Sequence, residues 1–76
     1  MIVYVVMIRR NGSPRALMMD DEFRLLEEAD ANSDLVRHAV RGLAPQQADP
    51  ARLNGALSGL TPEESREAIF YRVIFT

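Results

Sequence analysis

The chain has 76 residues, no cysteine and a formal net charge of −2 at pH 7, and 47% of its residues are hydrophobic. This length fits one small domain over residues 1–76, and the composition is that of an ordinary globular protein. The lack of cysteine excludes disulfide bonds, thiolate nucleophiles and cysteine-based metal sites. The acidic balance makes nucleic acid an unfavourable direct partner.

The first predicted element is a β-hairpin formed by residues 2–9 and 14–19. The first of these segments is rich in β-branched and aromatic side chains, which favour a strand. Asn11 and Gly12 follow it, and both tolerate the positive φ angles that a two-residue hairpin turn requires. The apolar start of the chain is too short to span a bilayer and lacks the features of a secretion signal. We therefore expect a cytoplasmic protein that does not associate with membranes.

A turn of two residues also fixes the pairing of the two strands. It places Arg10 opposite Ser13 and, further along, Tyr4 opposite Met19. In this register Pro14 lies at a pair without hydrogen bonds, where the first strand does not need the N–H group that proline lacks. A proline at this position predicts that the second strand forms an edge of the sheet.

Three or four short helices are predicted to pack on the hairpin. The first covers residues 21–30 and begins after Asp20, whose carboxylate favours the N-cap position. The second begins after Ser33 and is closed by Gly42, because glycine readily adopts the positive φ at which many helices end. Residues 43–49 are interpreted as a flexible joint between the two halves of the chain.

The second half begins with a short apolar stripe after Asp49-Pro50, which predicts a third helix. A fourth helix is predicted over residues 62–69. Thr61 is its expected N-cap, Pro62 occupies the first helical position, and Glu64 completes a capping box.

Residues 70–75 favour a third strand by composition, since aromatic and β-branched side chains predominate. They also continue the apolar face of the preceding helix, so a single helix to the end of the chain is the alternative. The predicted fold class is therefore α+β, with an N-terminal hairpin packed against three or four short helices.

The first strand is apolar on both faces of the predicted sheet. One face carries Val3, Val5 and Met7, and the other carries Ile2, Tyr4, Val6 and Ile8. A hairpin alone is marginally stable, and a few short helices do not easily cover both of its faces. We therefore expect a second copy or another macromolecule to cover one sheet face, the free edge of the first strand or the C-terminal segment. The alternative is a compact fold in which residues 70–75 pair with the first strand.

No pattern in the sequence indicates catalysis, a cofactor or a bound metal. His38 is the single histidine, and it shares one short segment with Ser33 and Asp34, which does not give the geometry of a catalytic triad. The acidic residues 20–22 are consecutive, so on a helix they point about 100° apart and do not converge on one ion. We therefore predict that the protein is not an enzyme.

Residues 6–23 resemble part of a known family. They read as an apolar strand, Arg9-Arg10, a Gly-x-Pro turn, a second apolar strand, the acidic pair Asp20-Asp21 and Phe23. This order resembles the strand–turn–strand–helix unit of Phd/YefM-type antitoxins. The resemblance implies an antitoxin-like transcriptional repressor that dimerises and binds operator DNA.

Residues 56–72 carry a second resemblance. Ala56-Leu57, Leu60-Thr61-Pro62 and Arg66 follow the order found at the start of sigma-factor region four. The segment is similar to that region, and the similarity implies contact with the transcription machinery.

We therefore predict a small non-enzymatic regulatory protein that binds a larger bacterial protein assembly. The specific form that we favour is a phage-type inhibitor or regulator of host RNA polymerase, and the alternatives are a Phd/YefM-like repressor and a phage-encoded inhibitor of another host system. A homodimer is the other partner considered. Aromatic residues and arginine dominate binding hot spots. The predicted partner-binding residues are Tyr4, Arg9, Arg10, Arg15, Phe70, Tyr71 and Arg72.

Overall fold

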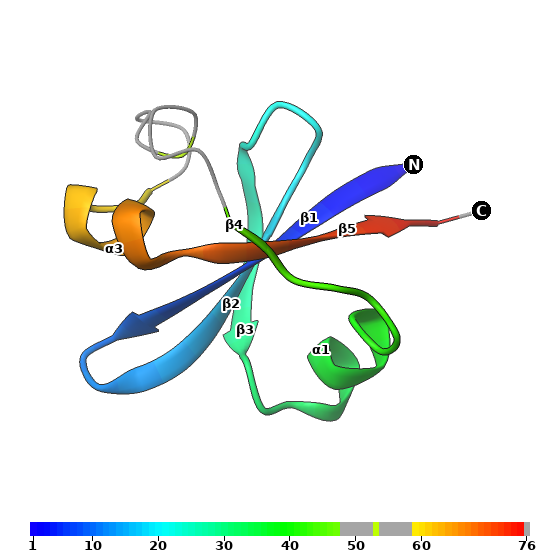
Figure 1. The fold of residues 1–76 in the computed structure, drawn as a ribbon, viewed down its shortest axis with the longest axis horizontal. Helices are drawn as coiled ribbons and strands as arrows, with labels where there is room; N and C mark the ends of the chain where they lie inside the picture. Colours follow the sequence, from blue (N-terminus) through cyan, green and yellow to red (C-terminus); the bar gives the residue numbers. More distant parts are fainter. Residues whose placement is uncertain (48–52, 54–58, 76) are drawn as a thin grey trace.

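The computed structural model describes residues 1–47, 53 and 59–75 (Figure 1). The strands are β1 (Ile2–Arg10), β2 (Ser13–Met19), β3 (Leu25–Asp30), β4 (Gln46–Gln47) and β5 (Ile69–Ile74), and the helices are α1 (Asp34–Ala39) and α3 (Pro62–Glu67). All strands belong to one antiparallel sheet in the order β3-β2-β1-β5-β4. The predicted α+β fold with three or four helices on a hairpin is therefore wrong, because the described residues form mainly a five-stranded sheet with two short helices.

The N-terminal hairpin is confirmed, together with its register. Arg10 pairs with Ser13 at the turn and Tyr4 pairs with Met19 at the far end. Asn11 has a φ of 53° and Gly12 a φ of 77°, as a two-residue turn of this kind requires. The local turn signal was sufficient here because it fixes every pair that follows it.

The prediction that β2 is an edge strand is wrong, because β3 pairs with its other side. This ladder begins at the pair Arg15 and Asp30. Pro14 lies just before that pair, and its carbonyl accepts a hydrogen bond from the Ala31 N–H at 3.2 Å. The proline is therefore at the end of the ladder, where no N–H is required of it.

The predicted helix over residues 21–30 is also wrong, because most of this segment forms β3. Asp20 does not start a helix: its carboxylate accepts hydrogen bonds from the backbone N–H groups of Glu22 and Arg24, both at 2.9 Å. Phe23 then adopts a φ of 61°, which is outside the helical region. The chain reverses direction at this turn and runs back along β2.

The second predicted helix is confirmed as α1. The Ser33 side chain accepts a hydrogen bond from the Val36 N–H, as an N-cap does. The C-cap is Val40, so Gly42, with its φ of 78°, lies one position beyond the place predicted for it. Further along, Gln46 and Gln47 form β4 within the segment interpreted as a joint. The predicted third helix and its start at Asp49-Pro50 lie outside the described residues, apart from the buried Leu53.

The C-terminal segment confirms the predicted strand. Thr61 and Glu64 form the predicted capping box at the start of α3, which ends at Glu67. Ala68 has an extended backbone with a ψ of 137°, and β5 follows it, so the alternative of one helix to the chain end is wrong. β5 pairs with β1 along its length, and the backbone groups of Met1 and Phe75 bind each other at the end of the ladder.

Pairing with β5 makes β1 an inner strand and changes the burial argument made from the sequence. Val3, Val5, Val6 and Ile8 expose at most 6% of their area. The predicted free edge of β1 is therefore wrong, and the chain covers both faces of β1 by itself. The compact alternative, with the C-terminal strand beside the first one, is the correct description.

Each face of the sheet carries its own buried cluster. The α3 face is the one on which Ala68, the C-cap of α3, is buried. Its cluster consists of Val6, Ile8, Leu17, Met19, Phe23, Leu53 and Ala68. The α1 face, which α1 covers through Val36, holds Val5, Ala16, Val36 and Val73. In Figure 1 the two helices lie far apart, α3 beside the start of β5 and α1 below its end.

No helix among the described residues is both long and apolar enough to cross a membrane.

Candidate docking surface

Arg10, one of the predicted binding residues, is engaged within the chain. Its Nε and Nη2 atoms donate to the two carboxylate oxygens of Glu64 at 2.8 and 3.0 Å. Its Nη1 atom donates to Glu28 at 3.2 Å, and Nη2 also donates to the Gly59 carbonyl at 3.2 Å. The hydrogen bonds from Arg10 hold the pKa of the Glu64 carboxyl at about 2, well below its usual value.

The other arginines of the hairpin are also occupied by groups of the chain. Arg15 lies 3.6 Å from the carboxylate of Glu28, which it shares with Arg10. Arg9 donates to the carbonyl of Gly12 at 2.8 Å, across the turn. The positive charges near the hairpin turn are therefore largely neutralised or held in place by groups of the chain itself.

The predicted aromatic residues divide between the two faces. On the α3 face, the Tyr4 ring stacks on Phe23 with centroids 4.5 Å apart and meets the edge of Phe70 at 5.5 Å. Tyr71 is half-buried against the cluster of the α1 face, and Arg72 is exposed. The seven predicted residues therefore do not form one surface.

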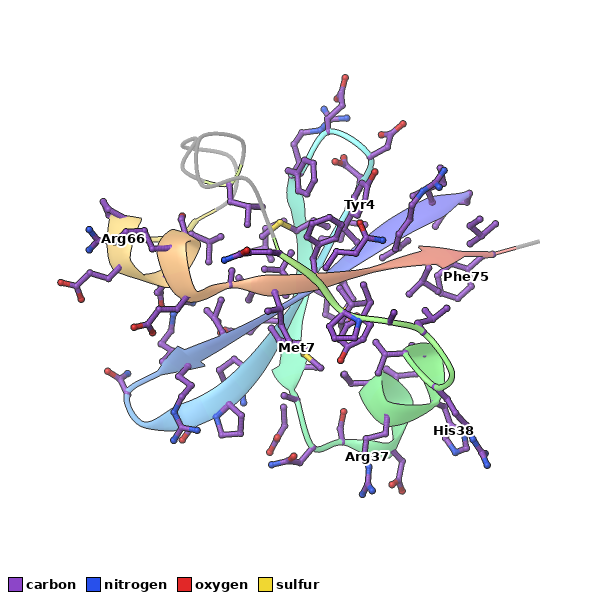
Figure 2. All side chains as sticks on the ribbon, in the orientation of Figure 1. Tyr4, Met7, Arg37, His38, Arg66 and Phe75 are labelled. Carbon is purple, nitrogen blue, oxygen red and sulfur yellow. The ribbon has the colours of Figure 1, made fainter. Side chains whose placement is uncertain are left out.

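An apolar groove lies on the α1 face instead, at the end of the sheet where the chain termini meet. The residues that define it are Met1, Val5, Leu26, Leu35, Ala39 and Phe75. It encloses about 240 Å³. Met1, Leu26, Leu35 and Phe75 expose 80%, 57%, 66% and 49% of their area. Figure 2 shows the labelled Phe75 on the side of the β5 ribbon that faces α1.

The groove exists because α1 covers only part of its face. Val36 inserts into the buried cluster with 1% of its area exposed. Successive helical residues are about 100° apart, so Leu35 and Ala39 lie beside Val36 on one flank of the helix. Leu35 remains 66% exposed on this flank, and the rest of the groove is lined by residues of β1, β2 and β3 and by Met1 and Phe75.

Charged groups border the groove on two sides. Glu27 of β3 lines it and belongs to no ion pair among the described residues. On the outer side of α1, a separate open hollow of about 350 Å³ is lined by Asp34, Arg37, His38 and Arg41. Arg37 and His38 project away from the sheet in Figure 2.

Sequence reasoning missed the groove because its walls come from distant segments. Met1 and Phe75 lie near opposite ends of the sequence, and Leu26 belongs to a segment whose composition predicts a helix but which forms β3. One local signal was available. Leu35 and Val36 are adjacent apolar residues of a short helix, and such a helix can bury only one of them fully against a sheet.

Groups with catalytic or metal-binding chemistry are sparse in the described part of the chain. Ser33 is the cap of α1, and His38 is exposed on that helix. Among the described residues, no three histidine or carboxylate side chains lie close enough to hold a metal ion. The Ser65 hydroxyl is buried and has no hydrogen-bond partner in the same part of the structure.

Comparison with known proteins does not place this geometry in a family. No family model, curated protein or solved structure matches the chain.

Proposed function

We propose that this chain is a small non-enzymatic regulatory protein that acts by binding a larger bacterial protein assembly in the cytoplasm. The observation that carries the proposal is the apolar groove, around which four large apolar side chains remain exposed. Single exposed apolar residues are common on protein surfaces. Their concentration around one hollow is a feature of binding surfaces.

The size and lining of the groove support an apolar protein segment as its occupant. Its volume of about 240 Å³ is below the range of about 300–1,000 Å³ that suits drug-sized ligands. Such a space accepts the ends of apolar side chains. Burying one leucine or phenylalanine side chain contributes about 1.5–3 kcal/mol, so Leu26, Leu35 and Phe75 offer a substantial part of a binding free energy.

Host RNA polymerase is the assembly that we propose as the target. The similarity of residues 56–72 to the start of sigma-factor region four supports this choice. The groove supports the wider proposal of protein docking independently of that similarity.

Binding to purified bacterial RNA polymerase tests the proposal, with two matched leucine variants. Leu35→Gln places a polar side chain in the groove at an exposed helical position. Leu43→Gln makes the same change at a leucine that is 39% exposed and does not line the groove. We expect the wild-type chain and Leu43→Gln to bind equally, and Leu35→Gln to bind roughly tenfold more weakly.

Each other result has a definite meaning. Full binding by Leu35→Gln would show that the groove is not the docking surface. Absence of binding by the wild-type chain would show that RNA polymerase is the wrong target. A wild-type dimer that shifts DNA with steep salt dependence would favour the antitoxin-like repressor.

A further inference from the structure

We infer that the occupant of the apolar groove is an amphipathic helix of a partner protein whose acidic side chains lie over the outer side of α1. This inference rests on the proposed docking function but not on the choice of RNA polymerase. It follows from the charges that border the groove and from the area that the groove exposes.

Helix α1 separates the groove from a positively charged surface. Leu35 and Ala39 face the groove, and Arg37, His38 and Arg41 lie on the outer side of the helix with Asp34. His38 lies about 60° from Leu35 around the helix axis, so the side of α1 that lines the groove is next to the side that carries the charged residues. A segment seated in the groove therefore passes close to this positive surface.

The two arginines of this surface are available to a partner. Arg10, Arg15 and Arg24 are held by carboxylates of the chain. Arg37 and Arg41 have no such partner in the described residues. Their guanidinium groups can therefore bind carboxylates of another molecule, and the planar fork of arginine suits that pairing.

Glu27, which lines the groove from β3 rather than from α1, places a negative charge at that part of its border. An acidic side chain placed over β3 would be repelled by it, whereas the same side chain over α1 is attracted. The charges therefore favour one lateral arrangement of an acidic partner helix. Apolar residues spaced three or four positions apart enter the groove, and acidic residues occupy the flank next to α1.

The exposed area argues against a second copy as the occupant. Met1, Leu26, Leu35 and Phe75 expose between 49% and 80% of their area. Together they offer roughly 400–500 Å² of side-chain surface, whereas a stable dimer buries about 800 Å² on each partner. A single helix is smaller than a second copy of the chain. It therefore needs a smaller contact area on this protein to bury most of its own apolar face.

Binding of two synthetic helical peptides to the full chain, measured by NMR titration, tests the inference. Both peptides carry leucine at positions i, i+3, i+4 and i+7, and one carries glutamate along one flank where the other carries glutamine. We expect both to shift the signals of Leu26, Leu35 and Phe75. The glutamate peptide is expected to bind roughly three- to tenfold more tightly at low salt and to lose most of this advantage in 0.5 M NaCl.

Variants of the chain identify the source of the preference. The double change Arg37→Gln and Arg41→Gln, at exposed positions outside the groove, is expected to remove the preference and to leave binding of the glutamine peptide unchanged. Arg66→Gln, at an exposed arginine of α3, is the control and is expected to keep the preference.

Three results would overturn the inference, and they are distinguishable. Equal binding of the two peptides would show that the acidic side chains of the partner do not contribute to binding, while the groove would remain a docking surface. Failure of both peptides to shift the groove signals would show that the groove does not bind an amphipathic helix. The polymerase binding assay then tests the proposed docking function separately. A dimer that Leu35→Gln dissociates makes a second copy the occupant.

Discussion

Arg10 and Glu64, which are 54 positions apart in sequence, join β1 to α3 through two hydrogen bonds of 2.8 and 3.0 Å. The same carboxylate accepts a hydrogen bond from the Thr61 N–H at 2.9 Å and thereby completes the capping box of α3. The Glu64 carboxylate therefore has two roles: it caps the N-terminus of α3, and it attaches that helix to the sheet through Arg10. Its side chain exposes 12% of its area and that of Arg10 exposes 33%, so the pair is only partly screened by water.

Replacing Glu64 by glutamine is expected to lower the free energy of unfolding by about 1–2 kcal/mol. Glutamine retains an acceptor for the capping box. It loses the charge that strengthens the hydrogen bonds from Arg10, and the partial exposure of Arg10 reduces the cost. Urea denaturation measures the change. Glu63→Gln, at an exposed position of the same first turn, is the control and should change stability by a few tenths of a kcal/mol. Equal effects of the two variants would show that the pairing with Arg10 does not stabilise the fold.

The same pair predicts how stability depends on acid pH. The pKa of Glu64 falls from 4.5 to about 2 on folding, so the carboxylate favours the folded state above its unfolded pKa. That contribution is lost as the pH falls from about 5 towards 2. Asp20 acts in the same direction, because hydrogen bonds from the backbone of Arg24 lower its pKa. Denaturation curves between pH 7 and pH 2 should show a shallower decline for Glu64→Gln than for the wild-type chain. Parallel declines would contradict the assignment.

Phe23 and Phe75 predict opposite outcomes for the same substitution. Phe23 is 6% exposed and its ring stacks on Tyr4, whereas Phe75 is 49% exposed at the groove. Phe23→Ala is expected to cost about 3 kcal/mol or more of stability, because it leaves a cavity and alanine does not relieve the positive φ. Phe75→Ala should cost less than about 1 kcal/mol and weaken partner binding. Thermal unfolding and the polymerase binding assay separate the two effects. A Phe23→Ala variant of unchanged stability would contradict the assignment of Phe23 to the core, and full binding by Phe75→Ala would contradict the assignment of Phe75 to the docking surface.

Apart from β5, which its composition favoured over a continued helix, the elements that the sequence predicted correctly are those with a complete local signal. Asn11-Gly12 specifies its turn, Ser33 caps α1, and Thr61 and Glu64 cap α3. β3 was missed because its sequence, Leu-Leu-Glu-Glu-Ala-Asp, consists mainly of good helix formers. Pairing with β2 outweighs that preference, and a sequence pattern does not reveal the pairing.

The candidate site could not be predicted for a related reason. The arginines of the hairpin looked available for a partner, since Glu28 and Glu64 approach them only after β3 and α3 are in place. The groove likewise depends on bringing α1 next to residues of β1, β2 and β3 and to both ends of the chain. Both features arise from contacts between distant segments, which composition and periodicity do not encode.

Gly12 offers a test of how strongly the turn controls this fold. Its φ is 77° and a Cβ atom at this position would meet nothing within 4 Å, so any cost of Gly12→Ala comes from the backbone alone. A left-handed conformation costs an alanine residue about 1–2 kcal/mol, and we expect a loss of stability of this size. Asn11→Gly is the control, because it removes the same type of strain at the neighbouring φ of 53° and should leave stability nearly unchanged or slightly higher. Two-dimensional NMR of the variant should retain the pairing of Tyr4 with Met19 if the apolar faces of β1 hold the register unaided. A loss of that pairing in Gly12→Ala would show that the turn, rather than the packing of the two faces, fixes the hairpin.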